Sequence, residues 1–260
     1  MKTILYSPTS EANDNDTFFE SMEVAIELGG DILVFPENAY TPYNSLLESV
    51  DILNGEEYDT VLECLYDFCA ELGHAAVFNA TDDFGFNYSI FANPMAHKGE
   101  TFNKLYIKHT NARLTCFDLE DYDKCIAELF EPIIYRGRKI ALCIGEDIFL
   151  PNLLKCYGSN KADFVINSFS NDIDLHSLSV ASQKIAPWQN QVITSCGFGG
   201  NCFGISPSKG EIKIEDAGYD LYTINTDNCD YLTQKSSAEV FFDSTEKYLS
   251  KNADKYKLLK

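Results

Sequence analysis

Residues 138–151 read RKIALCIGEDIFLP. The run over residues 140–144 is apolar throughout, which is typical of a strand that is covered on both faces of its sheet. Gly145 follows this run directly, and the residues after it read as the start of a helix. A turn from a strand into a helix can present a nucleophile beside backbone N–H groups that stabilise an oxyanion. A tight turn alone would also explain a glycine there.

Strand and helix patterns alternate on both sides of this stretch. Residues 14–30 repeat apolar side chains at helical spacing and close on two glycines, which predicts a helix and its end. This alternation predicts an α/β protein, and the short connections between the later strands predict mixed sheets. Residues 211–216 read as one of those strands. Residues 175–190 read as helical, with Pro187 at a break or in a turn.

Two charged residues follow buried strands elsewhere in the chain. Glu37 ends the segment VFPE, where an apolar core can raise the pKa of a carboxyl and make it a general base. Lys108 ends the segment KLYIK. Each has a simpler interpretation: Glu37 could be a loop acid in solvent, and Lys108 could be a surface lysine at a strand end.

Composition narrows the classes of partner. The chain has 40 acidic and 20 basic residues and a formal net charge of −20, which repels nucleic-acid phosphates and anionic lipid. Nine cysteines without a C-x-x-C pair and four histidines argue against a zinc site and indicate a reducing compartment. We expect no zinc site, no nucleic acid and no membrane partner.

The sequence of 260 residues shows no repeat, linker or low-complexity tract. It is long enough to bury a large core, so we expect a single domain over residues 1–260, with a C-terminal tail from about residue 245. The apolar stretch near the N-terminus is too short for a signal peptide, and no run of about 18 apolar residues occurs. We therefore expect a cytoplasmic protein.

In order, these segments resemble motifs of the carbon–nitrogen hydrolase, or nitrilase, superfamily. That family has a Glu–Lys–Cys triad in motifs similar to F-P-E, Y-x-K and C-x-D-x-x-F-P. Here VFPE supplies Glu37 and YIK supplies Lys108, while GEDIFLP puts Gly145 at the cysteine position with Asp147 and Pro151 in register. The separations of 71 and 37 residues are close to those of the family, and the resemblance covers nearly the whole chain.

The resemblance implies a four-layer α-β-β-α sandwich of two mixed sheets. It implies a small amide or nitrile-like ligand and a homodimer, for which residues 149–158 are the expected contact. In the family mechanism a cysteine thiolate attacks the carbon, glutamate moves the proton to the leaving amine, and lysine with a backbone N–H holds the oxyanion. Water then hydrolyses the thioester, without metal or cofactor.

The departure at Gly145 decides the expected activity, because glycine has no side chain that could attack a carbon. The resemblance then implies an amidase-like protein whose activity is weak or lost. The alternative is a catalytically inactive pseudoenzyme that serves as a ligand-binding or assembly protein. A third interpretation is that Gly145 is an engineered or erroneous substitution.

Two further residues are candidates for the site. Cys143 is a substitute nucleophile, although it lies two residues, or about 6.6 Å, back along the strand and therefore inside the core. The family also has an additional active-site glutamate after the lysine. Glu120 is the candidate for it, with Asp118 and Asp121 as competitors, and each could equally be one acid among many.

Overall fold

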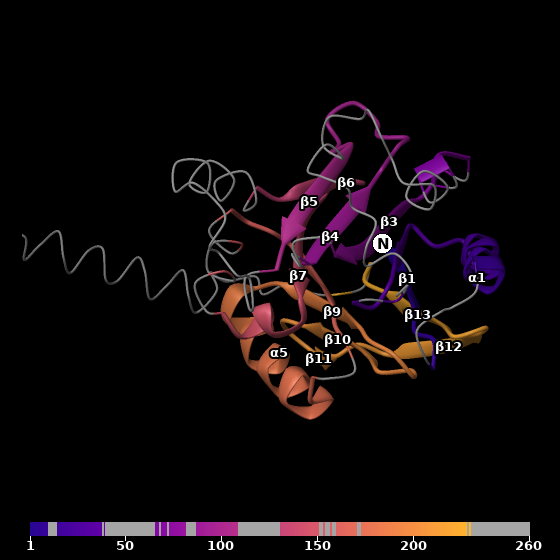
Figure 1. Ribbon diagram of the computed structural model, residues 1–260. Coiled ribbons are helices and arrows are strands. Elements are labelled where there is room, and N and C mark those ends of the chain that lie inside the picture. The colour runs from indigo at the N-terminus through magenta and orange to yellow at the C-terminus, as the bar shows by residue number, and fades with distance from the viewer. Residues whose placement is uncertain are drawn as a thin grey trace, which may run out of the picture.

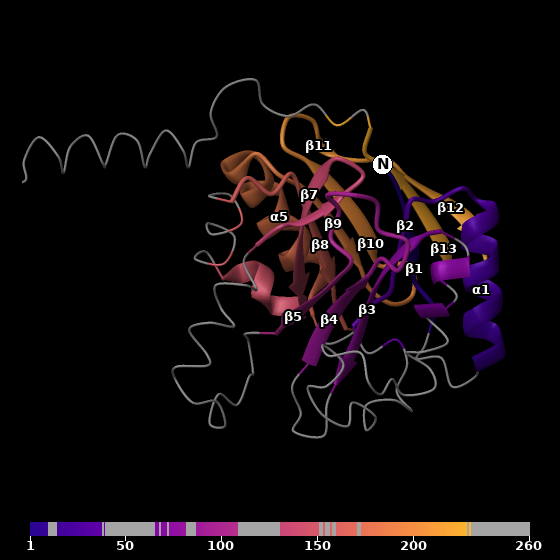
Figure 2. The ribbon, with the colours of Figure 1, turned by 90° about the horizontal axis from the view of Figure 1, so that it is seen from above.

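The computed structural model describes residues 1–9, 15–37, 39, 66, 67, 69–71, 73–81, 87–108, 131–150, 153, 157, 160–170, 173–227 and 229. Two β-sheets pack face to face, and the helices α1 and α5 lie on opposite outer sides of the pair (Figures 1 and 2). This is the expected α-β-β-α sandwich of two mixed sheets. The predictions for the segment around Glu120 and for the C-terminal tail fall outside the described residues.

The first sheet has seven strands. Their order is β12 (Ile214–Gly218), β13 (Leu221–Asn225), β1 (Lys2–Tyr6), β2 (Ile32–Val34), β3 (Ala75–Thr81), β4 (Asn87–Ala92) and β5 (Asn103–Ile107). The three strands β1, β2 and β3 run parallel, and the outer strands pair antiparallel. Glu37 follows β2 and Lys108 follows β5, so both come from this sheet.

The second sheet has six strands. Their order is β11 (Gly210–Glu211), β10 (Cys202–Ser206), β9 (Val192–Cys196), β8 (Phe164–Ser168), β7 (Arg138–Ile144) and β6 (Ile133–Tyr135). The three strands β7, β8 and β9 run parallel. Every residue of β8 and β9 is buried, as expected for strands that are covered on both faces of the sheet.

The first sheet buries both of its faces. Leu5 of β1 and Val34 of β2 pack into the core between the sheets, together with Leu142 and Ile166 of the second sheet. Neighbouring residues on the same strands, such as Ile4 and Leu33, face the other way and pack with Ala25 of α1 (Asn15–Glu27). Successive strand residues alternate between faces, so one strand serves both layers.

Helix α5 (Leu175–Gln189) covers the second sheet and contacts β9 and β10. Asp174 caps its start by accepting hydrogen bonds from the backbone N–H groups of His176 and Ser177. The expected break at Pro187 is wrong, because Pro187 lies inside α5. The helix ends two residues later and continues into Asn190 with φ of 56°, so the proline disturbs only the last turn.

The prediction of one strand over residues 211–216 is also wrong. Glu211 ends β11 in the second sheet, whereas Ile214 begins β12 in the first. The alternating pattern holds on both sides of the crossing, so the sequence gives no sign that the chain changes sheets. Gly145 opens a short 3-10 turn, η4 (Gly145–Phe149), and Leu153 and Tyr157, in the helix expected after it, are α-helical.

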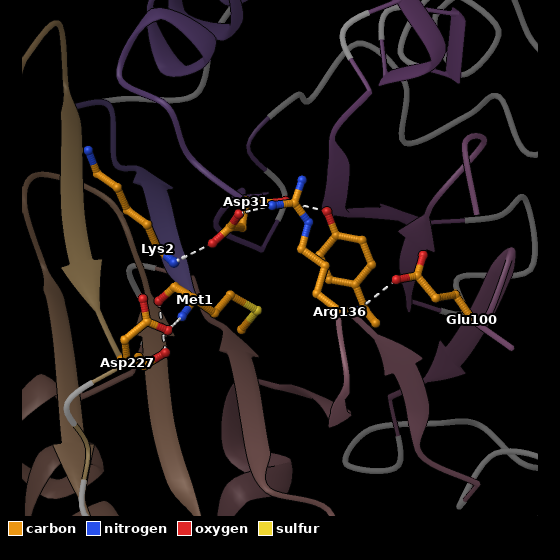
Figure 3. Close-up of polar contacts among 8 residues, drawn as sticks. Met1, Lys2, Asp31, Glu100, Arg136 and Asp227 are labelled. Carbon is orange, nitrogen blue, oxygen red and sulfur yellow. Dashed lines mark hydrogen bonds and ion pairs between the residues drawn. The ribbon is translucent and has the colours of Figure 1, made fainter. Parts of the chain in front are cut away.

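A charged cluster joins the two sheets where β2 begins (Figure 3). Asp31 precedes β2, accepts a hydrogen bond from the backbone N–H of Lys2 at 2.7 Å, and forms an ion pair with Arg136 in the β6–β7 turn. The Tyr135 hydroxyl donates to the Asp31 carbonyl at 2.6 Å, and Glu100 accepts from the Arg136 backbone N–H at 2.9 Å. We call these residues the Asp31 cluster.

Candidate active site

Glu37 lies just past the end of β2, opposite the end where Asp31 lies, and only 3% of its side chain is exposed. Its Oε1 accepts hydrogen bonds from Asn87 Nδ2 at 2.6 Å and Lys108 Nζ at 2.7 Å. Its Oε2 is buried and has no hydrogen-bond partner among the described residues. Such a carboxylate oxygen is costly to bury unless something else meets it there.

Lys108 bridges the first sheet and η4. Its backbone N–H donates to the Asn87 carbonyl at 2.8 Å, which fixes the chain as it leaves β5. Its Nζ lies 2.7 Å from Glu37 Oε1 and 3.0 Å from Glu146 Oε2, the residue after Gly145. Lys108 is therefore held between two carboxylates and is not a surface lysine.

Burial and charge act in opposite directions on the two central groups. Burial raises the pKa of Glu37, and Lys108 opposes this only in part, so the pKa stays above its usual value. Burial lowers the pKa of Lys108, but Glu37 and Glu146 outweigh it and the pKa is raised. A carboxylate with a raised pKa beside a stable cation suits proton transfer next to a developing negative charge.

Gly145 lies at the turn from β7 into η4 with φ of +55°, a conformation that L side chains rarely adopt. A Cβ added there would lie 3.0 Å from Glu37 Oε2, 3.1 Å from Lys108 Nζ and 2.9 Å from Ile173 Cδ1. A side chain at this position would therefore project between the glutamate and the lysine. It would also require these three neighbours to move by a few tenths of an ångström.

A buried hydrogen bond ties the lysine strand to the glycine turn. The Tyr106 hydroxyl donates to Asp147 Oδ2 at 2.6 Å, and both side chains are almost completely buried. Tyr106 lies two residues before Lys108, and Asp147 lies two residues after Gly145. The family motifs put Asp147 in register, but the sequence did not reveal its partner.

Cys143 lies on β7 within the hydrophobic core and is fully buried. Burial raises the pKa of its thiol well above the usual value, which disfavours the reactive thiolate. Its role as a substitute nucleophile stays a prediction. Glu120, Asp118 and Asp121 lie outside the described residues.

Three residues at the site were not expected from the sequence. Asn87 begins β4, Glu146 follows Gly145, and Ile173 lies between β8 and α5. Glu146 had a sequence signal, because it adjoins the nucleophile position. Asn87 and Ile173 reach the site only through the pairing and packing of distant segments, so neither had a local signal.

Across the described parts of the chain, no three His, Cys, Asp or Glu side chains gather in an arrangement that could hold a metal ion. In the same residues, no helix is both long and apolar enough to cross a membrane.

Solved structures of the nitrilase superfamily are similar to this chain. Nit3 of Saccharomyces cerevisiae, from branch 10 of the superfamily, is 14% identical, with 86% of this chain and 88% of that chain covered and a TM-score of 0.62. A cysteine-to-alanine variant of the amidase from Nesterenkonia AN1 is 15% identical, with 94% and 96% covered and a TM-score of 0.63.

A glutamate-to-glutamine variant of the same amidase carries the acetamide moiety of fluoroacetamide on its active-site cysteine. It is 15% identical, with 94% of this chain and 96% of that chain covered and a TM-score of 0.64. No model of a known family matches the sequence, and no curated protein matches it significantly. The structural matches show that this chain has the carbon–nitrogen hydrolase fold of the nitrilase superfamily.

Proposed function

We propose that this chain is an amidase-like carbon–nitrogen hydrolase with a disabled nucleophile. It binds a small amide or nitrile-like ligand at Glu37 and Lys108 and hydrolyses it slowly or not at all. The observation that carries the proposal is the direction of the absent Gly145 side chain, which would project between Glu37 Oε2 and Lys108 Nζ. The Nesterenkonia amidase, which has this fold, binds butyramide as a cysteine-to-alanine variant, and this supports the ligand class.

Without a thiolate, the residual reaction is direct attack by water. Glu37 takes a proton from water while the water oxygen bonds to the amide carbon, and Lys108 holds the resulting oxyanion. The C–N bond then breaks, and Glu37 returns the proton to the leaving amine, so one water and one amide give one acid and one amine. General-base assistance contributes about 10²–10⁴-fold. Loss of the nucleophile from a coupled catalytic unit costs on the order of 10⁶-fold.

The second candidate is a pseudoenzyme that only binds its ligand. Crowding at Gly145 favours it, because Ile173 Cδ1 lies where a nucleophile would need room. Lys108 is already engaged by Glu37 and Glu146, which leaves less of its charge for an oxyanion. In this case butyramide binds and no amine is released.

The decisive experiment measures ammonia release from acetamide and butyramide by four proteins: the unaltered chain, Gly145→Cys, Gly145→Ala, and Gly145→Cys with Ile173→Val. Ile173→Val deletes the Cδ1 atom that crowds the site. We expect turnover to rise in the cysteine variants and most in the double variant, by about 10²-fold or more. Gly145→Ala is the matched control, since it adds the same Cβ and backbone strain without a thiol.

The result separates the two candidates and tests the proposal itself. The water route is supported if the unaltered chain hydrolyses the amide and Glu37→Gln abolishes this turnover. Butyramide binding without turnover in the unaltered chain supports the pseudoenzyme. If no variant binds or hydrolyses an amide although all fold, the proposed ligand class is wrong.

The remaining roles are proposals of the same kind. A role of Cys143 as substitute nucleophile would be supported if iodoacetamide labelling of Cys143 and loss of turnover proceed in parallel. A role of Glu120 as the additional active-site glutamate would be supported if Glu120→Gln loses turnover. The homodimer through residues 149–158 is tested by light scattering across micromolar concentrations. Leu153 and Tyr157 are already buried within the protomer, so such a contact must use the other faces of this segment. A single domain and a cytoplasmic location stay predictions.

A further inference from the structure

Two cysteines face each other on neighbouring strands. Cys196 ends β9, Cys202 begins β10, and the antiparallel register pairs them directly. The Cys196 carbonyl accepts a hydrogen bond from the Phe169 N–H at 2.9 Å, on the β8 side. The N–H and C=O of one residue point to the same side of a strand, so Cys196 and Cys202 form a non-hydrogen-bonded pair. The Cα atoms of such a pair lie about 4.5 Å apart, within the span of ~4.4–6.8 Å that a disulfide bridges.

The two thiols differ in accessibility and in acidity. The neighbouring Cys196 thiol outweighs burial and lowers the pKa of Cys202. Burial, with the bond to Cys202, raises the pKa of Cys196 well above its usual value. Cys202 is partly exposed, whereas Cys196 is completely buried. Cys202 therefore has the properties of an attacking thiolate, and Cys196 those of a protonated neighbour.

We infer that Cys196 and Cys202 form a thiol–disulfide site, at which Cys202 reacts with a low-molecular-weight disulfide and Cys196 resolves the adduct. The Cys202 thiolate attacks one sulfur of oxidised glutathione, which forms a mixed disulfide and releases one glutathione thiolate. The Cys196 thiol loses its proton and attacks Cys202 Sγ, which forms the Cys196–Cys202 bond and releases the second glutathione. Overall, two protein thiols are oxidised and one glutathione disulfide is reduced to two thiols.

The site lies at the contact between the two sheets. Cys196 Sγ is 3.1 Å from the Tyr6 carbonyl oxygen and 3.5 Å from the Val34 carbonyl oxygen, at the ends of β1 and β2. Oxidation of Cys196 removes the S–H group that faces these two carbonyl oxygens. One of them belongs to Val34, three residues before Glu37. The inference does not depend on the proposed amidase function, because it rests on the thiol pair alone.

The other described cysteines lack this arrangement. Cys69 and Cys143 are buried, and burial raises the pKa of Cys69 to about 12. Cys229 is partly exposed and belongs to the same exposure class as Cys202. Cys229→Ser is therefore a matched control for Cys202→Ser.

The test incubates the folded, reduced protein with oxidised glutathione, blocks the remaining thiols, and maps the bonds by mass spectrometry. We expect the unaltered chain and Cys229→Ser to lose two hydrogen atoms and to give a peptide cross-linked between Cys196 and Cys202. Cys196→Ser should stop at a stable glutathione adduct on Cys202. Cys202→Ser should form no disulfide within β9 and β10.

Three results would overturn the inference. One is a folded, unaltered protein that stays fully reduced, and another is a disulfide that joins other cysteines. The third is a Cys196→Ser protein whose adduct forms on Cys229 rather than Cys202. Mapping of the unaltered chain needs no substitution, so it decides the matter even if a serine variant fails to fold.

Discussion

The two ends of β2 each carry a charged cluster, and the clusters differ in how completely they are paired. Before the strand, both Asp31 carboxylate oxygens have partners: Oδ1 pairs with Arg136, and Oδ2 accepts from the Lys2 N–H. After the strand, Glu37 Oε1 takes two donors while Oε2 has none among the described residues. A stable fold would bury the fully paired acid more deeply, but the reverse holds here. Asp31 is 21% exposed and Glu37 only 3%.

The comparison separates a cluster that joins the sheets from one that fits the proposed ligand site. A fully paired, partly exposed acid is explained by the contacts it makes. A deeply buried acid with one unpartnered oxygen lowers stability unless it serves another purpose, and functional sites are where such groups gather. We therefore propose that the chemistry of this protein belongs to the Glu37 end of β2 and that the Asp31 end is structural.

The largest expected difference is in catalysis. In the Gly145→Cys, Ile173→Val background, adding Glu37→Gln should lower amide turnover by about 10²–10⁴-fold, because the general base is lost. Adding Asp31→Asn should change it by no more than about twofold, because distant sites act independently. Steady-state ammonia release measures both. An equal loss in the two variants would remove the distinction between the clusters.

A smaller and opposite difference is expected in stability. Asp31→Ala should lower the free energy of unfolding by about 1–3 kcal/mol, because it removes the charge-assisted bonds to Arg136 and Lys2. Glu37→Gln should change it by less than about 1 kcal/mol, since the amide keeps an acceptor and Lys108 keeps Glu146. Urea denaturation measures both. If Glu37→Gln costs more than Asp31→Ala, the unpartnered oxygen is not a source of strain.

The smallest expected difference is in the pH dependence of stability. Glu37 has a raised pKa in the folded state, so its contribution is fully present below the unfolded value of 4.5 and is lost as pH rises through the folded value. Burial raises the pKa of Glu100, but the N–H groups of His97 and Arg136 outweigh it and the pKa is lowered. Its contribution is present above 4.5 and is lost as pH falls through the folded value.

Urea unfolding of Glu37→Gln and Glu100→Gln from pH 3 to pH 7, each compared with the unaltered chain, measures this difference. Glu37→Gln should gain stability relative to the unaltered chain as pH rises, and Glu100→Gln should lose it. Changes of the same sign would show that the two carboxyl groups have similar environments.

The sequence predicted more of the central strands than of the contacts between them. Strands β7 and β8 were identified from apolar runs, because strands buried on both faces have no polar alternation. The transfer of the chain from β11 to β12 was missed, since the alternation of polar and apolar residues over 211–215 continues across the crossing. Asp31 and Arg136 are 105 residues apart, and neither lies in a motif, so only the packed sheets reveal their pairing.

The two carboxylates that contact Lys108 affect which molecules enter and leave the site. With Glu37 and Glu146 ionised, the three groups carry one excess negative charge, and the chain around them has a net charge of −20. An amide is neutral and enters this field without penalty. The acid formed from it is an anion at neutral pH, so the same field repels it. Under the proposed function, the site is thus biased to admit the uncharged amide and to expel the acid formed from it.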